Sequence, residues 1–217
     1  IALPWLVVAE LATWIGASFI WPLTSVYLNK RLGISLSVIG IVLFCNCAAN
    51  MLGSTISGRL FDRLNPYPLI TGGMLLDALV LLAMAFFHGW PVYWVWLVCT
   101  GFLGGWNGAL VNSIATSLRK YPGRYVFNIL YFSQNLGVVI GTLVVGYLYD
   151  YSIEPLFIIA SCLFLIGTLV AFCKFKPIVA YHARRQEQKK TGQTPLKAEK
   201  MPKANFWMTM GFFITLG

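Results

Sequence analysis

Two acidic side chains stand inside long apolar runs, and their chemistry is the first feature of this sequence. Glu10 interrupts the run Ile1–Tyr27, and Asp77 lies well inside the run Asn65–Phe87. Charged groups are costly inside a bilayer, so they usually face a cavity or a partner and mark ion or substrate pathways. We therefore expect Glu10 and Asp77 to bind and release protons. The alternatives are that Glu10 reaches water at its end of the span, and that Asp77 anchors a neighbouring helix.

Aromatic and amide side chains in three of the runs could line a substrate cavity. Trp14 and Trp21 share a helical face with Glu10, because spacings of four and seven residues return to the same face. Their rings could stack on flat, apolar cations. Asn107 lies in a later run, and a polar face with spacing i, i+3, i+7 follows in the next. Hydrogen bonding between helices is the alternative role for such residues. The polar face consists of Asn128, Tyr131 and Asn135.

Six apolar runs must position these residues. Of the 217 residues, 58% are hydrophobic and 11% are charged, whereas soluble proteins average roughly 45–50% and 25%. This composition excludes a globular cytoplasmic enzyme, a disordered chain and a small disulfide-stapled module. A helix needs about 20 mainly apolar residues to cross the hydrocarbon core. The qualifying runs are Ile1–Tyr27, Leu32–Gly58, Asn65–Phe87, Gly89–Leu118, Tyr125–Tyr149 and Pro155–Cys173.

Lysine and arginine residues are distributed unevenly between the loops. All but two of the 16 lie after the second, fourth and sixth runs, and the exceptions are Lys30 and Arg31. The positive-inside rule predicts that this basic side and the N-terminus are cytoplasmic. Topology thus explains the net charge of +9 without a nucleic-acid partner. We expect a multi-pass protein of the cell membrane, with a six-helix bundle over residues 1–175, a basic cytoplasmic linker over 176–203 and the cut-off start of a seventh helix over 204–217.

The second and fifth runs carry the same short pattern at one end. Both read G-x4-G-x-L-aromatic-D, and the copies are 88 residues apart. Three spans separate them, so they would lie on opposite sides of the membrane. This arrangement predicts two inverted three-helix repeats, a device of secondary transporters. The first copy contains Gly53, Gly58, Leu60, Phe61 and Asp62, and the second contains Gly141, Gly146, Leu148, Tyr149 and Asp150.

With the loop sequence Gly-Arg-Leu-Phe-Asp-Arg over residues 58–63, the chain resembles the first half of a major facilitator superfamily transporter. That family's loop runs roughly G-x-L-x-D-R-x-G-R-K. Here Asn65 replaces the second glycine, whose left-handed conformation asparagine tolerates, and Pro66 and Tyr67 replace the basic pair. The resemblance implies that the loop latches the two halves of the transporter, and a simple tight turn is the alternative. The latch residues would be Gly58, Arg59, Asp62 and Arg63.

The first run is similar to the first helix of multidrug/proton antiporters of this superfamily. It contains Glu10, the sequence Thr-Trp-Ile-Gly at residues 13–16, and Pro22. The similarity implies that Glu10 takes part in proton and drug binding and that spans 1 and 4 line the cavity. Ser18 stands where some relatives have a second acid, so we include it among the cavity residues. The antiporter pattern also has an arginine in span 4 and a proline at the position of Thr142, and this sequence lacks both.

The sequence therefore predicts an all-α membrane transporter, the first half of a twelve-span fold, working by alternating access. The expected activity is proton-coupled efflux of small amphipathic, drug-like compounds. Uptake or facilitated diffusion of a nutrient such as a sugar is one alternative, and a six-span scaffold or channel is another. An enzyme is not expected, and neither is a cofactor or metal, because nucleotide-binding loops and Cys/His ligand spacings are absent. The expected partners are a small molecule, the proton, the bilayer and the C-terminal half of the same chain.

Overall fold

The computed structural model describes residues 2–116, 118, 122–148 and 153–176, and the secondary structure of this part of the chain consists of helices joined by short turns and loops. It contains six helical spans that are long and apolar enough to cross a membrane, which confirms the six predicted runs. The predicted linker beyond Lys176, the start of a seventh helix, and Asp150 lie outside the described residues. The helices are α1 (Ala2–Ala17), α2 (Ile20–Lys30), α3 (Leu36–Phe61), α4 (Pro66–Phe86), α5 (Val92–Ala115), α6 (Gly123–Leu148) and α7 (Glu154–Lys174).

The first span is built from two helices, α1 and α2, with a break at Ser18 and Phe19. Pro22 explains the break, because proline has no N–H to donate and its ring clashes with the carbonyl group four residues earlier, here that of Ser18. At the break, the Phe19 amide donates to the Gly16 carbonyl oxygen at 3.3 Å, which is a tighter turn than an α-helix. The apolar run is continuous in sequence, but the helix that it forms is interrupted at these two residues.

Helix α4 begins at a strong local start signal. Asn65 precedes the helix with extended backbone angles, φ −68° and ψ 117°, and its side chain accepts a hydrogen bond from the Tyr67 amide at 3.0 Å. Pro66 occupies the first helical position, where a missing N–H costs nothing. Asn65 therefore does not adopt the left-handed conformation that asparagine tolerates. It caps the helix instead, because an asparagine oxygen satisfies one of the free N–H groups at a helix start.

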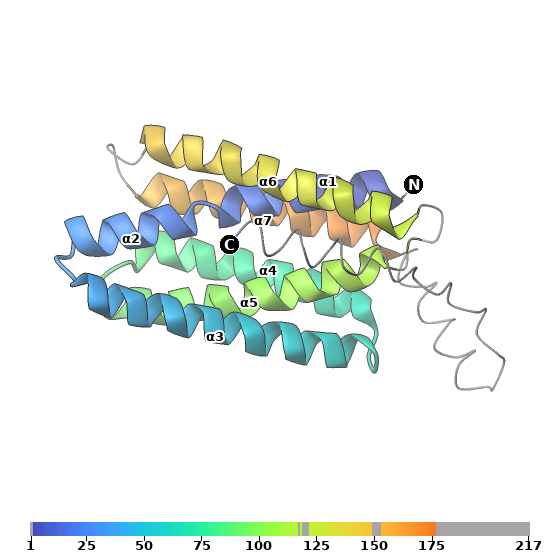
Figure 1. The fold of residues 1–217 in the computed structure, drawn as a ribbon, viewed down its shortest axis with the longest axis horizontal. Helices are drawn as coiled ribbons and strands as arrows, with labels where there is room; N and C mark the ends of the chain where they lie inside the picture. The colour runs from blue at the N-terminus through green and yellow to red at the C-terminus, as the bar shows by residue number, and fades with distance from the viewer. Residues whose placement is uncertain (1, 117, 119–121, 149–152, 177–217) are drawn as a thin grey trace, which may run out of the picture. The chain divides into compact units, whose positions relative to one another are not determined.

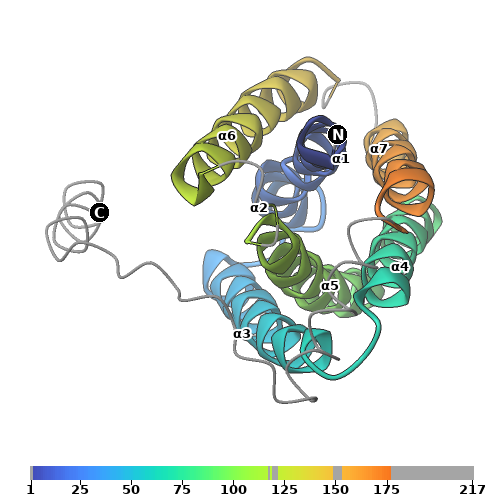
Figure 2. The same ribbon diagram turned by 90° about the vertical axis from the view of Figure 1, so that its right-hand side faces the viewer.

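The helices pack in pairs that follow the predicted repeat. Helix α1 lies between α6 and α7, and α5 lies between α3 and α4, while α4 also packs on α7 (Figure 2). If spans 1 and 4, 2 and 5, and 3 and 6 are exchanged, the α1–α6 and α3–α5 contacts change places, as do α1–α7 and α4–α5, and the α4–α7 contact returns to itself. The packing thus agrees with two inverted three-helix repeats.

The repeated glycines have matching environments in the two copies. A Cβ atom on Gly53 would collide with the Phe102 carbonyl oxygen of α5, and one on Gly141 would collide with Ile15 and Ser18 of the first span. In contrast, a Cβ atom on Gly58 or Gly146 would meet no atom within 4 Å. The first glycine of each copy therefore allows close approach of two helices, and the second does not.

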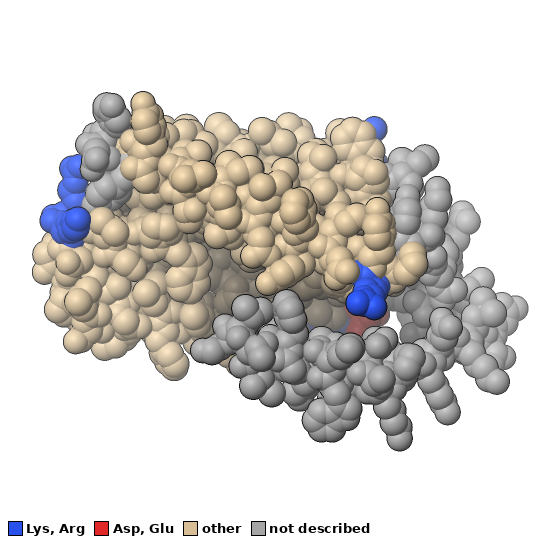
Figure 3. All heavy atoms as spheres, turned by 45° about the horizontal axis from the view of Figure 1, so that its top comes forward, with Lys and Arg blue, Asp and Glu red and all other residues tan. Residues whose placement is uncertain are grey.

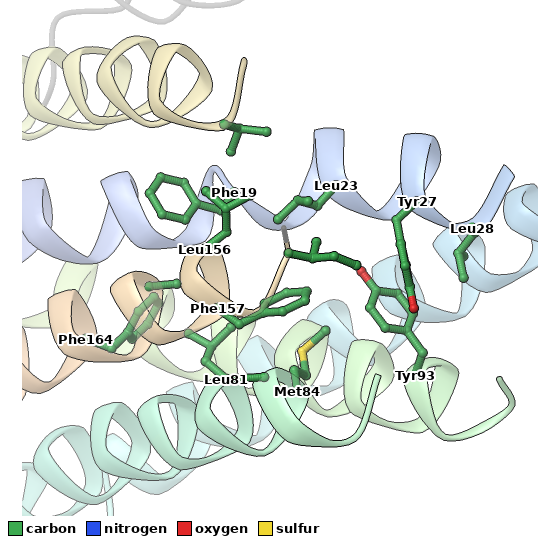
Figure 4. Packing of buried hydrophobic residues seen from close by; sticks show 14 of the residues in the cluster. Phe19, Leu23, Tyr27, Leu28, Leu81, Met84, Tyr93, Leu156, Phe157 and Phe164 are labelled. Carbon is green, nitrogen blue, oxygen red and sulfur yellow. The ribbon is translucent and has the colours of Figure 1, made fainter. Parts of the chain in front are cut away.

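Two clusters of buried apolar side chains fill the bundle, one toward each end. Phe19, Leu23, Leu81, Tyr93 and Phe157 are members of the first, where α2, α4, α5 and α7 converge (Figure 4). The second is built around the start of α1, the first half of α4, the end of α5 and the end of α7. On the face shown in Figure 3, the visible lysine and arginine side chains lie toward the two ends of the bundle.

Candidate functional site

A layer of buried polar side chains separates the two apolar clusters. On α1, Glu10 follows Ala9 of the second cluster and precedes Phe19 of the first. On α4, Asp77 lies between Met74 of the second cluster and Ala78 of the first. The two acids of the sequence therefore lie at the same level of the bundle, on different helices.

Glu10 is buried, with 4% of its surface exposed, and binds two neutral donors. The Trp14 indole Nε1, one turn along α1, donates to Glu10 Oε2 at 2.8 Å. The Gln134 amide Nε2, which comes from α6, donates to the same Oε2 atom at 3.2 Å. The alternative in which Glu10 simply reaches water at the end of its span does not describe this bundle.

The two donors use one carboxyl oxygen and leave the other for a proton. Among the described residues, Glu10 Oε1 accepts no hydrogen bond. A protonated carboxyl group carries its hydrogen on one oxygen and still accepts through the other. Glu10 can therefore gain a proton on Oε1 while Oε2 keeps both of its donors, so the same geometry accommodates the charged and the neutral acid.

Small residues bring α6 directly against α1 beside this carboxyl group. A Cβ atom on Gly137 would lie 2.9 Å from the Trp14 Cβ atom, and Gly141 packs on Ile15 and Ser18. Ser18 donates to the Ile15 carbonyl oxygen at 2.8 Å and is buried. Its side chain thus belongs to the contact between span 1 and α6, whereas we expected it among the cavity residues.

Within the part of the chain that the structure describes, Asp77 has one hydrogen-bond partner, a neutral group on the adjacent helix. It is 2% exposed, and the Asn107 Nδ2 atom of α5 donates to its Oδ2 atom at 3.2 Å. The Asn107 Oδ1 atom is buried without a hydrogen-bond partner and lies against Gly73. Asn107, expected in the cavity wall, is therefore directed into the contact between α4 and α5, and it links those helices through Asp77.

The other predicted cavity residues project out of the six-helix bundle. Trp21 is 54% exposed and Tyr131 is 59% exposed, and Asn128 and Asn135 are exposed as well. Trp14 is 37% exposed although its indole nitrogen binds Glu10. These side chains are accessible to groups outside the bundle, which Ser18 and Asn107 are not.

The predicted latch residues lie at the turn between α3 and α4. Asp62 caps the C-terminus of α3, and Arg59, Asp62 and Arg63 are all exposed. Within the described part of the chain, none of these three side chains forms an ion pair. The ion pair that is present joins His88 and Glu154 at 3.6 Å, at the opposite end of the bundle. The charges of the loop are thus presented outward.

Sequence reasoning missed Gln134, which lies beside the polar face of the fifth run but was not assigned a role. A signal for it exists in the repeat, because Gln134 is 88 residues after Asn46, the same offset as Gly141 from Gly53. A side-chain amide at this position in both copies, buried at Asn46 and half-buried at Gln134, indicates a shared task. Within the described residues there is no group of three side chains suited to hold a metal ion.

Comparison with known proteins agrees with this architecture. The family model described as Major Facilitator Superfamily matches residues 6–217. An uncharacterised MFS-type transporter, YttB of Bacillus subtilis (strain 168), is 34% identical over 177 residues, which is 82% of this chain and 45% of that protein. Multidrug resistance protein MdtH of Enterobacter sp. (strain 638) is 26% identical over 74% of this chain and 40% of its own length.

A solved structure shares the fold. The crystal structure of a mutant of peptide transporter POT, in complex with alafosfalin, aligns with a TM-score of 0.70 and 21% identity over 99% of this chain and 45% of that one. The chain spans less than half the length of each of these relatives.

The described fold is thus a bundle of six spans long and apolar enough to cross a membrane, and its packing agrees with two inverted repeats. The chain belongs to the Major Facilitator Superfamily. The family and the relatives that it matches are transporters of the MFS type.

Proposed function

We propose that this protein works as a proton-coupled exporter of small amphipathic compounds, with Glu10 as the proton-binding residue. The observation that carries the proposal is the Glu10–Trp14 pair. One end of Trp14, its Nε1 atom, holds the buried carboxyl group at 2.8 Å, and the ring itself is 37% exposed. A compound that contacts the exposed ring would therefore be sensitive to the protonation state of Glu10.

This arrangement supports exchange of a proton for a cationic or aromatic compound. A cation near the Trp14 ring is favoured by the ring's electrostatics and by a charged carboxylate behind it. A proton on Glu10 removes that charge and weakens the site for the cation. Binding of one therefore opposes binding of the other, which is the coupling that antiport requires. The likeness to multidrug resistance protein MdtH agrees with a compound of this chemistry.

The remaining roles complete the proposal. Trp21, Asn128, Tyr131 and Asn135 contribute to a wall that faces the C-terminal half of the protein, while Asp77 is a second proton-binding acid or an anchor. The loop containing Arg59, Asp62 and Arg63 latches the two halves on the cytoplasmic side of a cell membrane. Proton binding shifts the balance between inward- and outward-open states by its different affinity for the two.

The test uses full-length protein in inverted membrane vesicles with a proton gradient reported by a quenched dye. Lipophilic cations and common sugars are added in turn. We expect cations to restore fluorescence in the wild type and not in Glu10→Gln, which keeps the side-chain shape but cannot bind a proton. Glu154→Gln, at an exposed acid far from Trp14, is the matched control and should behave like the wild type.

Two results would overturn the proposal. A response to cations that survives Glu10→Gln would keep antiport but remove Glu10 from it. The other result is that folded protein does not respond to cations. If it then responds to sugars, or shows no proton dependence at all, nutrient uptake or facilitated diffusion would be favoured.

A further inference from the structure

We propose that Gln134 is the positioning residue of the Glu10 site: it sets how tightly Glu10 holds its proton and transmits the change of charge to α6. This inference rests on the proposed function of Glu10. Gln134 does not reach the exposed face of Trp14, so it would act through the carboxyl group and not on the transported compound.

The inverted repeat identifies the ordinary task of this amide. Asn46, its equivalent on α3, donates through Nδ2 to the Leu97 carbonyl oxygen of α5 at 2.6 Å. Gln134 on α6 donates through Nε2 to Glu10 Oε2 of α1 at 3.2 Å. Both bonds run from the second helix of one repeat to the first helix of the other. The amide therefore ties the same pair of helices together in each copy.

The two copies differ in the group that accepts the bond. The Leu97 acceptor is a backbone carbonyl group, whose charge does not change. The Glu10 acceptor is a carboxyl group, which loses its charge when it binds a proton. Hydrogen bonds to ionised acceptors are roughly twice as strong as those between neutral groups. The tie between α3 and α5 is thus constant, whereas the tie between α1 and α6 strengthens and weakens with the protonation of Glu10.

The change in bond strength falls where α6 touches α1 most closely. On α6, Gly137 packs against Trp14. One turn later, Gly141 packs against Ile15 and Ser18. Neither glycine has a side chain of its own, so a shift of α6 is passed directly to Trp14, Ile15 and Ser18 of span 1. Protonation of Glu10 would therefore loosen this helix pair, and release of the proton would tighten it.

No charged group competes with Gln134 for Glu10 within the described residues. The helices packed on α1 are α6 and α7, and none of their titratable side chains bonds to or pairs with Glu10. Those side chains are all exposed or half-exposed. They are Arg124, Tyr125, Tyr131 and Tyr147 in α6, and Glu154, Cys162, Cys173 and Lys174 in α7. The electrostatic surroundings of the carboxyl group are therefore set by the neutral donors of Trp14 and Gln134.

The experiment compares two matched variants of the full-length protein. Gln134→Met keeps the length of the side chain and removes its donors, and Asn46→Leu does the same in the other repeat. The pH profile of substrate-driven proton movement is measured in vesicles, together with thermal stability. We expect Gln134→Met to move the midpoint upward by about one pH unit, a tenfold change in proton concentration, because the charged acid has lost a donor. Asn46→Leu should lower stability and leave the midpoint unchanged.

The outcomes separate this inference from the function on which it rests. An unshifted midpoint in Gln134→Met, or an equal shift in Asn46→Leu, would reduce Gln134 to a structural bond. Proton dependence that persists in Glu10→Gln would instead overturn the proposed function. If Gln134→Met does not fold, Gln134→Asn is measured in its place, because it keeps the amide but shortens its reach; a smaller upward shift supports the inference and no shift overturns it.

Discussion

At the scale of single residues, Glu10 and Asp77 differ in what their donors touch. The Trp14 ring that binds Glu10 is partly exposed, so the carboxyl group is connected to the outside of the bundle. The Asn107 amide that binds Asp77 is buried between α4 and α5. We therefore propose different tasks for two acids with similar burial, proton exchange for Glu10 and anchoring for Asp77.

This contrast leads to a prediction for Asp77. Asp77→Asn keeps a side-chain oxygen that accepts from Asn107, so we expect folded protein that retains transport and its proton dependence. Asn107→Leu removes the donor and leaves Asp77 buried without it, which should destabilise the protein by about 1–3 kcal/mol. Thermal unfolding and vesicle transport of the full-length protein measure both effects. Loss of proton coupling in stable Asp77→Asn protein would instead make Asp77 a proton relay.

At the scale of helices, close approach is controlled by the first glycine of each repeat copy. Gly53 and Gly141 each face the backbone of a neighbouring helix, so that a methyl group has no room. Gly40 of α3 and Gly146 of α6 face open space within the described bundle. The same residue type thus has two different consequences on the same two helices.

Alanine substitutions provide the corresponding test. Gly53→Ala and Gly141→Ala should each destabilise the full-length protein by about 1–3 kcal/mol, because an overpacked contact forces the helices apart. Gly40→Ala and Gly146→Ala are matched controls and should be neutral or stabilising by up to about 1 kcal/mol, since alanine favours helix over glycine. Thermal stability in one detergent compares all four. Equal losses at all four positions would contradict the packing described for α3 and α6.

At the scale of the whole molecule, the distribution of charge predicts orientation. The last turn of α3 carries Arg59 and the loop to α4 carries Arg63, whereas Lys30 and Arg31 lie at the opposite end, close to Gly33. Because most basic residues lie on the first side, we expect that side to be cytoplasmic.

Cysteine labelling in intact cells checks this orientation. The five native cysteines are first replaced by serine or alanine. Gly33→Cys should then react with a membrane-impermeant maleimide in intact cells, whereas Leu64→Cys should react only after the membrane is opened. The reverse pattern would contradict the predicted topology and, with it, a cytoplasmic latch.

The number and extent of the spans follow from the sequence alone, because crossing a bilayer requires only a local length of apolar residues. The glycine pattern at an offset of 88 residues likewise predicts the repeat without any knowledge of the contacts between helices. The two buried acids were recognisable because charge is rare inside apolar runs. The break at Ser18 and Phe19 has a local cause in Pro22, although the apolar run itself conceals it.

Which polar side chains meet was decided only by the tertiary structure. Helices that are apolar all round do not reveal in sequence which face packs on protein and which faces lipid. The rotation of each helix therefore came from long-range packing at glycines such as Gly137 and Gly141. That packing directed Ser18 and Asn107 into helix contacts and brought Gln134 to Glu10 across 124 residues of sequence. Local apolar length determines the spans, but the close approach of distant helices determines the site.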